Sequence, residues 1–152
     1  MVPQTLESIV PIPAPAGYSH VRLTVTDIAR SRAFYDRVFG FPVAYEAPPA
    51  DADAATRDAL GFLFGGVIYA FGSGNLLGLR PVAPGDDAFS EDRVGLDHVA
   101  FQLLSKAELD SAVGVLDELG VAHSGPKNLG PIWILEFRDP DGVALELTAP
   151  SD

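Results

Sequence analysis

Two histidines and one glutamate stand where their side chains could hold a metal ion together. His20 and His98 each open a stretch of alternating polar and apolar residues, the pattern of a half-buried strand. Glu146 alternates with Leu145 and Leu147 in the last such stretch. Two imidazoles and a carboxylate are the ligand set of the facial triad, which leaves coordination positions open for substrate and for water or dioxygen. We therefore expect His20, His98 and Glu146 to bind one divalent metal ion.

The two histidines occupy equivalent positions of an internal repeat. Residues 18–45 (YSHVRLTVTDIARSRAFYDRVFGFPVAY) align with residues 96–123 (LDHVAFQLLSKAELDSAVGVLDELGVAH) when His20 is placed on His98. A single strand histidine is more often an ordinary core or surface residue than a ligand. Two matched histidines beside a carboxylate favour the metal, because burying all three without one carries a desolvation cost.

Each copy of the repeat reads as a strand, a helix and three further strands. Asp27 and Ser105 are expected helix N-caps, and glycines at 40 and 120 are expected after the helix ends. Asp-Pro-Asp-Gly at 139–142 is a strong turn signal between the last two strands. The sequence therefore predicts an α+β fold built from two βαβββ modules.

The chain also shows where these modules begin and end. Residues 48–60 read as an insertion in the first module, with a short helix capped by Asp51 or Asp53. Four prolines make the N-terminus an extended arm. The expected segments are the proline-rich arm at 1–16, the first module at 17–81, an acidic linker at 82–94 and the second module at 95–150.

Composition narrows the classes of function. The chain has 152 residues, of which 47% are hydrophobic, and this suits one compact domain with a core. A formal net charge of −11 argues against nucleic acid and anionic membranes as partners. No apolar stretch is long enough to cross a bilayer, and no basic and apolar secretory signal opens the chain. The absence of cysteine excludes thiolate chemistry, and a cytoplasmic location is the default expectation.

Three motifs carry a resemblance to a known family: SHVRLTVTDIARSRAFYDRVFGF, DHVAFQL and FRDPDGVALEL. With them the chain resembles the vicinal-oxygen-chelate superfamily, also called the glyoxalase/bleomycin-resistance/dioxygenase group. The resemblance implies two βαβββ modules whose sheets curl into a cup-shaped, partly open mixed β-barrel around the metal, with the helices outside. It also implies a homodimer, in some members with modules exchanged between chains.

One departure from the family pattern bears on the reaction. Glyoxalase I enzymes resemble this chain but use an additional ligand in the last strand of the first module, where Gly78 aligns with Glu146. Glyoxalase activity is therefore disfavoured. The three-ligand set resembles that of extradiol dioxygenases, with ferrous iron, and of fosfomycin-resistance thiol transferases, with manganese.

The expected function is accordingly an extradiol-type, dioxygenase-like enzyme acting on a small substrate with adjacent oxygen atoms. The metal expected first is Fe(II), and Mn(II) or Zn(II) is the next choice. Two alternatives stay open, namely a metal-free protein that binds a drug or aromatic ligand and a fosfomycin-type thiol transferase.

Further polar residues share the face that carries the expected ligands. Arg22, Thr24 and Gln102 are candidate substrate contacts, and Arg22 could either hold an anionic group or form a salt bridge at the rim. Glu136 is either a second carboxylate near the metal or an exposed edge residue. His123 has no counterpart in the first module and is expected at the surface or rim. No catalytic acid or base is assigned.

Overall fold

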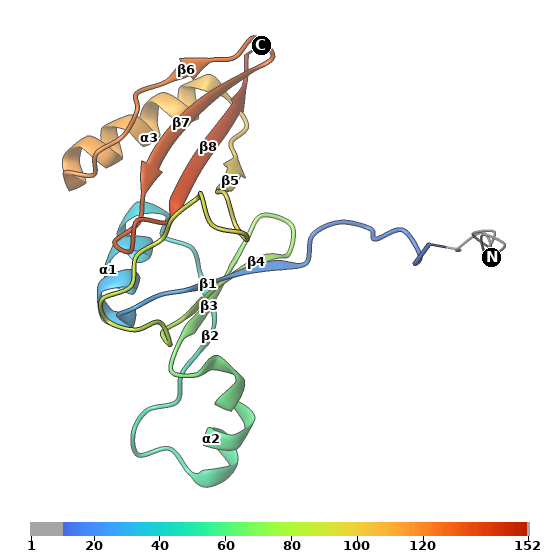
Figure 1. Ribbon diagram of the computed structural model, residues 1–152, viewed down its shortest axis with the longest axis vertical. Coiled ribbons are helices and arrows are strands. Elements are labelled where there is room, and N and C mark those ends of the chain that lie inside the picture. Colours follow the sequence, from blue (N-terminus) through green and yellow to red (C-terminus); the bar gives the residue numbers. More distant parts are fainter. Residues whose placement is uncertain (1–10, 152) are drawn as a thin grey trace, which may run out of the picture.

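The structure of the protein is a computed structural model, and it describes residues 11–151. Two four-stranded mixed sheets, each with one long helix, form the body (Figure 1). Module one contains β1 (His20–Thr24), α1 (Ile28–Val38), β2 (Val43–Glu46), β3 (Val67–Phe71) and β4 (Asn75–Arg80). Module two contains β5 (Val99–Gln102), α3 (Lys106–Leu119), β6 (Lys127–Asn128), β7 (Ile132–Arg138) and β8 (Ala144–Pro150). The insertion of module one contains α2 (Ala54–Ala59) and a 3-10 helix (Gly61–Leu63).

The two modules repeat one sheet topology. The strand orders are β1-β4-β3-β2 and β5-β8-β7-β6, and only the pairs β1 with β4 and β5 with β8 run parallel. Gly78 lies opposite Arg22, and Glu146 lies opposite Ala100. Arg22 and Ala100 each stand two residues after their histidine, so Gly78 and Glu146 hold equivalent places. The predicted α+β fold of two βαβββ modules is confirmed.

Local signals explain where the helices begin and end. The Asp27 side chain accepts the backbone N–H of Arg30 at 3.0 Å, and Ser105 accepts that of Glu108 at 3.2 Å. These side chains satisfy donors that have no partner inside the helix. Gly120 closes α3 in the left-handed region with φ +67°, where a Cβ would be strained. The short helix of the insertion is capped by Asp53, one of the two expected residues.

Aromatic rings from both modules meet in one shared core. Phe101 of module two packs against Phe39 and Phe71 of module one, with ring centroids 4.9 and 5.5 Å apart. Helices α1 and α3 also contact each other, so both modules bury their helix-bearing sides together. Within the chain the two sheets do not close into the barrel that the family resemblance implies. Their opposite faces do not pack against the other module, and the insertion covers part of the face of module one.

The turn between β7 and β8 fastens module two to the start of α1. Asp141 accepts hydrogen bonds from the backbone N–H of Thr26 at 2.9 Å and from its hydroxyl at 2.6 Å. Arg30 donates to the same carboxylate at 2.5 Å. The buried Tyr35 hydroxyl donates to Asp139 at 3.0 Å. The predicted turn is therefore also a contact between the modules.

The described part of the predicted arm, residues 11–16, contains no helix or strand and runs away from the body (Figure 1). The rest of that arm lies outside the described residues. In residues 11–151, no helix has the length and apolar character needed to cross a membrane.

Candidate metal centre

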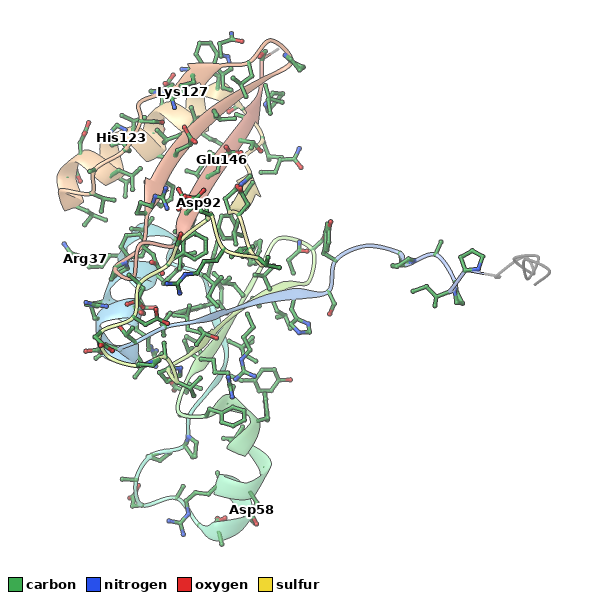
Figure 2. All side chains as sticks on the ribbon, in the orientation of Figure 1. Arg37, Asp58, Asp92, His123, Lys127 and Glu146 are labelled. Carbon is green, nitrogen blue, oxygen red and sulfur yellow. The ribbon has the colours of Figure 1, made fainter. Side chains whose placement is uncertain are left out.

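His98 and Glu146 lie in the same cavity on the uncovered face of module two. The cavity has a volume of about 550 Å³, and Glu136 lines it as well. Leu145 and Leu147 are buried in the core, so Glu146 points to the opposite face of β8, where Figure 2 shows it. Glu136 stands directly opposite Glu146 in the antiparallel ladder. Glu136 and Glu146 thus place two carboxylates beside His98 in this cavity.

The ring of His98 is held by the residue before it. The carboxylate of Asp97 lies 2.5 Å from Nδ1, which leaves Nε2 as the nitrogen available to a metal. A carboxylate on the second nitrogen is the usual way in which proteins orient a metal-binding histidine. The pKa of His98 is raised, first by the Asp97 hydrogen bond and further by the negative charges of Glu146 and Glu136. The cavity is thus electrostatically suited to a cation.

His20 repeats this arrangement in module one. The Ser19 hydroxyl lies 3.1 Å from Nδ1 of His20, so Nε2 again stays available. His20 lines a different cavity, of about 360 Å³, together with Gln102 from β5. Both histidines are therefore oriented by the side chain that precedes them.

A single chain brings together two of the three predicted ligands. Within residues 11–151, no three His, Cys, Asp or Glu side chains lie close enough to hold one metal ion. His98 and Glu146 share the face of module two, whereas His20 stands on module one. The alternation pattern shows which face each side chain takes, but not which two faces meet.

Two further charged pairs border the cavity of His98. Lys127 donates to Oε2 of Glu136 at 2.5 Å, and Arg138 pairs with Glu91 of the linker. The hydrogen bond from Arg138 lowers the pKa of Glu91 to about 2. The sequence left two interpretations of Glu136, a second carboxylate near the metal or an exposed edge residue. In the structure its side chain is half-exposed and also lies opposite Glu146.

His123 lines the same cavity without a nitrogen left for a metal. Its Nδ1 accepts the backbone N–H of Gly125 at 3.0 Å, and its Nε2 lies 3.1 Å from a carboxylate oxygen of Asp117. Both ring nitrogens are therefore engaged within module two. This fits the rim position expected for His123.

The three candidate substrate contacts, Arg22, Thr24 and Gln102, do not lie together in one cavity. Arg22 shares the outward face of β1 with His20, because Val21 and Leu23 pack into the core. Its Nη2 donates to the backbone carbonyl of Phe62 at 2.7 Å, and it forms no ion pair with any residue of 11–151. Thr24, at the far end of β1, lines another cavity of about 240 Å³.

Sequence reasoning missed two kinds of residue at these faces. Asp97 and Ser19, which hold the histidine rings, were detectable only as polar residues directly before each histidine. Phe62 and Phe64 come from the insertion and contact Arg22, which no strand periodicity could indicate.

The comparisons with known proteins agree with this fold. The model of the Glyoxalase/Bleomycin resistance protein/Dioxygenase superfamily matches residues 17–147. The chain belongs to this superfamily. A search of curated proteins gave no match.

Solved structures of the same superfamily superpose on most of the chain. A glyoxylase/bleomycin resistance protein/dioxygenase domain from Frankia sp. EAN1pec is 28% identical, with a TM-score of 0.72, and covers 91% of this chain and 95% of its own. A lactoylglutathione lyase from Agrobacterium tumefaciens is 21% identical, with a TM-score of 0.66 and coverages of 90% and 96%. A mutant of the fosfomycin resistance protein FosX from Listeria monocytogenes, crystallised with Mn(II) and a dihydroxypropylphosphonic acid, is 21% identical, with a TM-score of 0.65 and coverages of 91% and 95%. At these identities the last two show a common fold.

Proposed function

We propose that this protein is a metal-dependent enzyme of its superfamily, acting on a small organic molecule that chelates the metal through adjacent oxygen atoms. The observation that carries the proposal is the pairing of His98 with Glu146 in one cavity, with Nδ1 of His98 held by Asp97. The donor set fits a divalent ion, since it offers a free imidazole nitrogen and a carboxylate in a cavity lined by further acids.

We further propose that a second copy of the chain supplies His20 to complete the centre. His20 and the His98–Glu146 pair project from two sheet faces that do not pack against the other module of the same chain. In a twofold homodimer, the face of module one on each chain meets the face of module two on its partner, which yields two identical three-ligand centres. This arrangement accounts for matched ligands that do not meet within one chain.

Each side chain of such a centre would have a distinct role. A metal ion bound there would act as a Lewis acid toward the substrate oxygens. His20, His98 and Glu146 bind the ion, and Asp97 fixes the ring of His98 so that Nε2 faces it. Lys127 occupies Oε2 of Glu136, which leaves Oε1 as the acceptor for a proton from a substrate hydroxyl.

The reaction that we favour is dioxygenase-like, of the extradiol type, with Fe(II) as the first-choice metal and Mn(II) or Zn(II) next. Gly78 supports this choice against glyoxalase I, because a glycine at the position equivalent to Glu146 offers no fourth side-chain ligand. A three-ligand centre keeps positions open for both a bidentate substrate and dioxygen.

A second candidate is inactivation of a phosphonate by a fosfomycin-type reaction. It is favoured by Arg22 and Arg80, two strand cations without an ion-pair partner in residues 11–151. The relative from Listeria monocytogenes was crystallised with Mn(II) and a phosphonic acid, which makes this a natural comparison.

Metal analysis and oxygen uptake test the proposal. Protein purified without oxygen should carry about one metal ion per chain by mass spectrometry, because the proposed dimer has one centre per chain. Metal that stays far below this level after reconstitution with Fe(II) and Mn(II) would contradict an enzyme and favour a ligand-binding protein.

Iron-loaded protein is then incubated with a panel of neutral and acidic catechols in an oxygen electrode. Oxygen uptake is the expected result. Full iron loading without uptake rejects the dioxygenase, and turnover of fosfomycin with a thiol or water by the manganese form selects the second candidate.

A further inference from the structure

Two arginines stand apart from the other cations of this acidic chain. Of its ten Lys and Arg side chains, six pair with Asp or Glu. Arg37 and Arg57 lie in the last turns of α1 and α2, where the helix dipole favours a positive charge. Arg22 and Arg80 remain, and their strands supply no such stabilisation. With 21 acidic residues in the chain, two strand cations without an acidic partner call for a functional explanation.

Both arginines are held against the same aromatic ring. The guanidinium carbon of Arg80 lies 4.2 Å from the centre of the Phe64 ring, and that of Arg22 lies 5.8 Å from it. The ring attracts each cation, but two positive charges beside one ring repel each other. Nε of Arg22 is buried and has no hydrogen-bond partner. An oxyanion placed here would relieve the repulsion.

The ring that organises this cluster has an unusual backbone. Phe64 has φ +53°, and it is the one non-glycine residue with positive φ in residues 11–151. A bulky side chain in the left-handed region carries a conformational cost, and such residues concentrate at ligand sites. Next to it, Phe62 forms an edge-to-face pair with Tyr45 at 6.2 Å. All three rings are about half exposed, so they offer apolar surface beside the two cations.

The cluster shares a sheet face with a proposed metal ligand. Arg22 stands two residues after His20 on the same face of β1, and Arg80 stands two residues after Gly78 on β4. A Cβ at Gly78 would lie 2.9 Å from Cγ of Arg22. Gly78, which offers no side chain as a fourth ligand, thus also leaves room for the Arg22 side chain to lie across the sheet.

We infer that Arg22, Arg80, Phe62, Phe64 and Tyr45 form a recognition site for an aryl oxyanion, that is, an aromatic ring bearing a carboxylate or a phosphonate. The guanidinium groups bind the oxyanion, and the exposed rings pack against the aryl group. The inference deepens the proposed function, on which it rests for placing the substrate near His20. It defines the substrate as an acidic aromatic compound and not a neutral catechol.

Binding of simple probes to metal-free protein tests the site independently of the metal chemistry. Benzoate, phenylphosphonate, neutral benzamide and non-aromatic cyclohexanecarboxylate are titrated by calorimetry into protein stripped of metal and, in parallel, into the Mn(II)-loaded form. Benzoate or phenylphosphonate should bind about ten-fold more tightly than benzamide, because charge-assisted hydrogen bonds are the stronger kind. The tighter of the two oxyanions identifies the acid group. The inference is overturned if neither benzoate nor phenylphosphonate binds more tightly than benzamide in either form.

Four substitutions, one of them a control, locate the effect. Arg22→Gln and Arg80→Gln should each remove most of the preference for the oxyanion, whereas Arg37→Gln on α1 (Figure 2) removes the same charge elsewhere and should leave it intact. Phe64→Leu should reduce the preference for benzoate over cyclohexanecarboxylate. Circular dichroism and metal content check that each variant is folded. An equal loss in Arg22→Gln and Arg37→Gln would show a general charge effect and reject the site, even if the metal centre were proven.

Discussion

Gly78 faces Arg22 across the parallel pair of β1 and β4, at the place that Glu146 takes in module two. Module two therefore has a carboxylate side chain at this position. In module one the position has no side chain, and the side chain of Arg22 lies over it. The two modules share one strand arrangement and differ in charge at this point, a carboxylate in module two and a guanidinium in module one.

Adding a methyl group at this position should disturb Arg22 and spare the metal. In Gly78→Ala, the new Cβ would lie 2.9 Å from Cγ of Arg22, so the guanidinium has to move. We expect benzoate to bind several-fold more weakly while metal content stays at the wild-type level. Gly85→Ala is the matched control, since nothing lies within 4 Å of a Cβ there. Unchanged benzoate affinity in Gly78→Ala would argue against the role of Arg22.

Mixed dimers test whether two chains share each metal centre. His20→Ala and His98→Ala should each abolish metal binding when expressed alone. When both are co-expressed, a mixed dimer contains one centre with no substitution and one with two. About a quarter of an ion per chain should return, because random pairing makes half of the twofold dimers mixed. Failure to recover metal in verified mixed dimers means that the chains do not share the centre.

The two histidines of the module-two cavity should respond differently to substitution. His98→Ala should lose the metal and keep the fold, since His98 is half-exposed and its ring lies outside the core. His123→Gln should retain the metal, because both nitrogens of His123 are engaged by Gly125 and Asp117. Metal content and circular dichroism are measured on both. Metal retained in His98→Ala would remove His98 from the ligand set.

The buried carboxylate of Asp141 should matter for stability and not for metal binding. Asp141→Ala leaves the N–H and hydroxyl of Thr26 and the guanidinium of Arg30 without their acceptor. We expect the free energy of unfolding to fall by about 2–4 kcal/mol, the range for breaking a buried polar network. Urea denaturation measures the change. The matched control is Asp58→Ala on exposed α2 (Figure 2), for which a change below about 0.5 kcal/mol is expected.

The fold could be predicted from the sequence because its signals are local and occur twice. Strand alternation around His20 and His98, the caps at Asp27 and Ser105, and the turn at 139–142 each depend on residues a few positions apart. The repeat then supported the equivalence of Gly78 and Glu146, which the strand register bears out.

The arrangement of the faces could not be predicted in this way. Whether module one covers module two within a chain depends on Phe39 and Phe71 packing against Phe101, and these contacts join distant segments. The contacts of Arg22 with Phe62 and Phe64 could not be predicted either, because these two residues belong to the insertion and not to a periodic strand.

The aromatic core between the modules has a consequence for how the chain folds. Rings of module one surround Phe101 of module two, and the turn at Asp141 is fastened to the start of α1. Separating the two modules would expose these apolar surfaces on both halves, at a large cost in hydration free energy. We therefore expect the two modules to unfold together, in one cooperative transition.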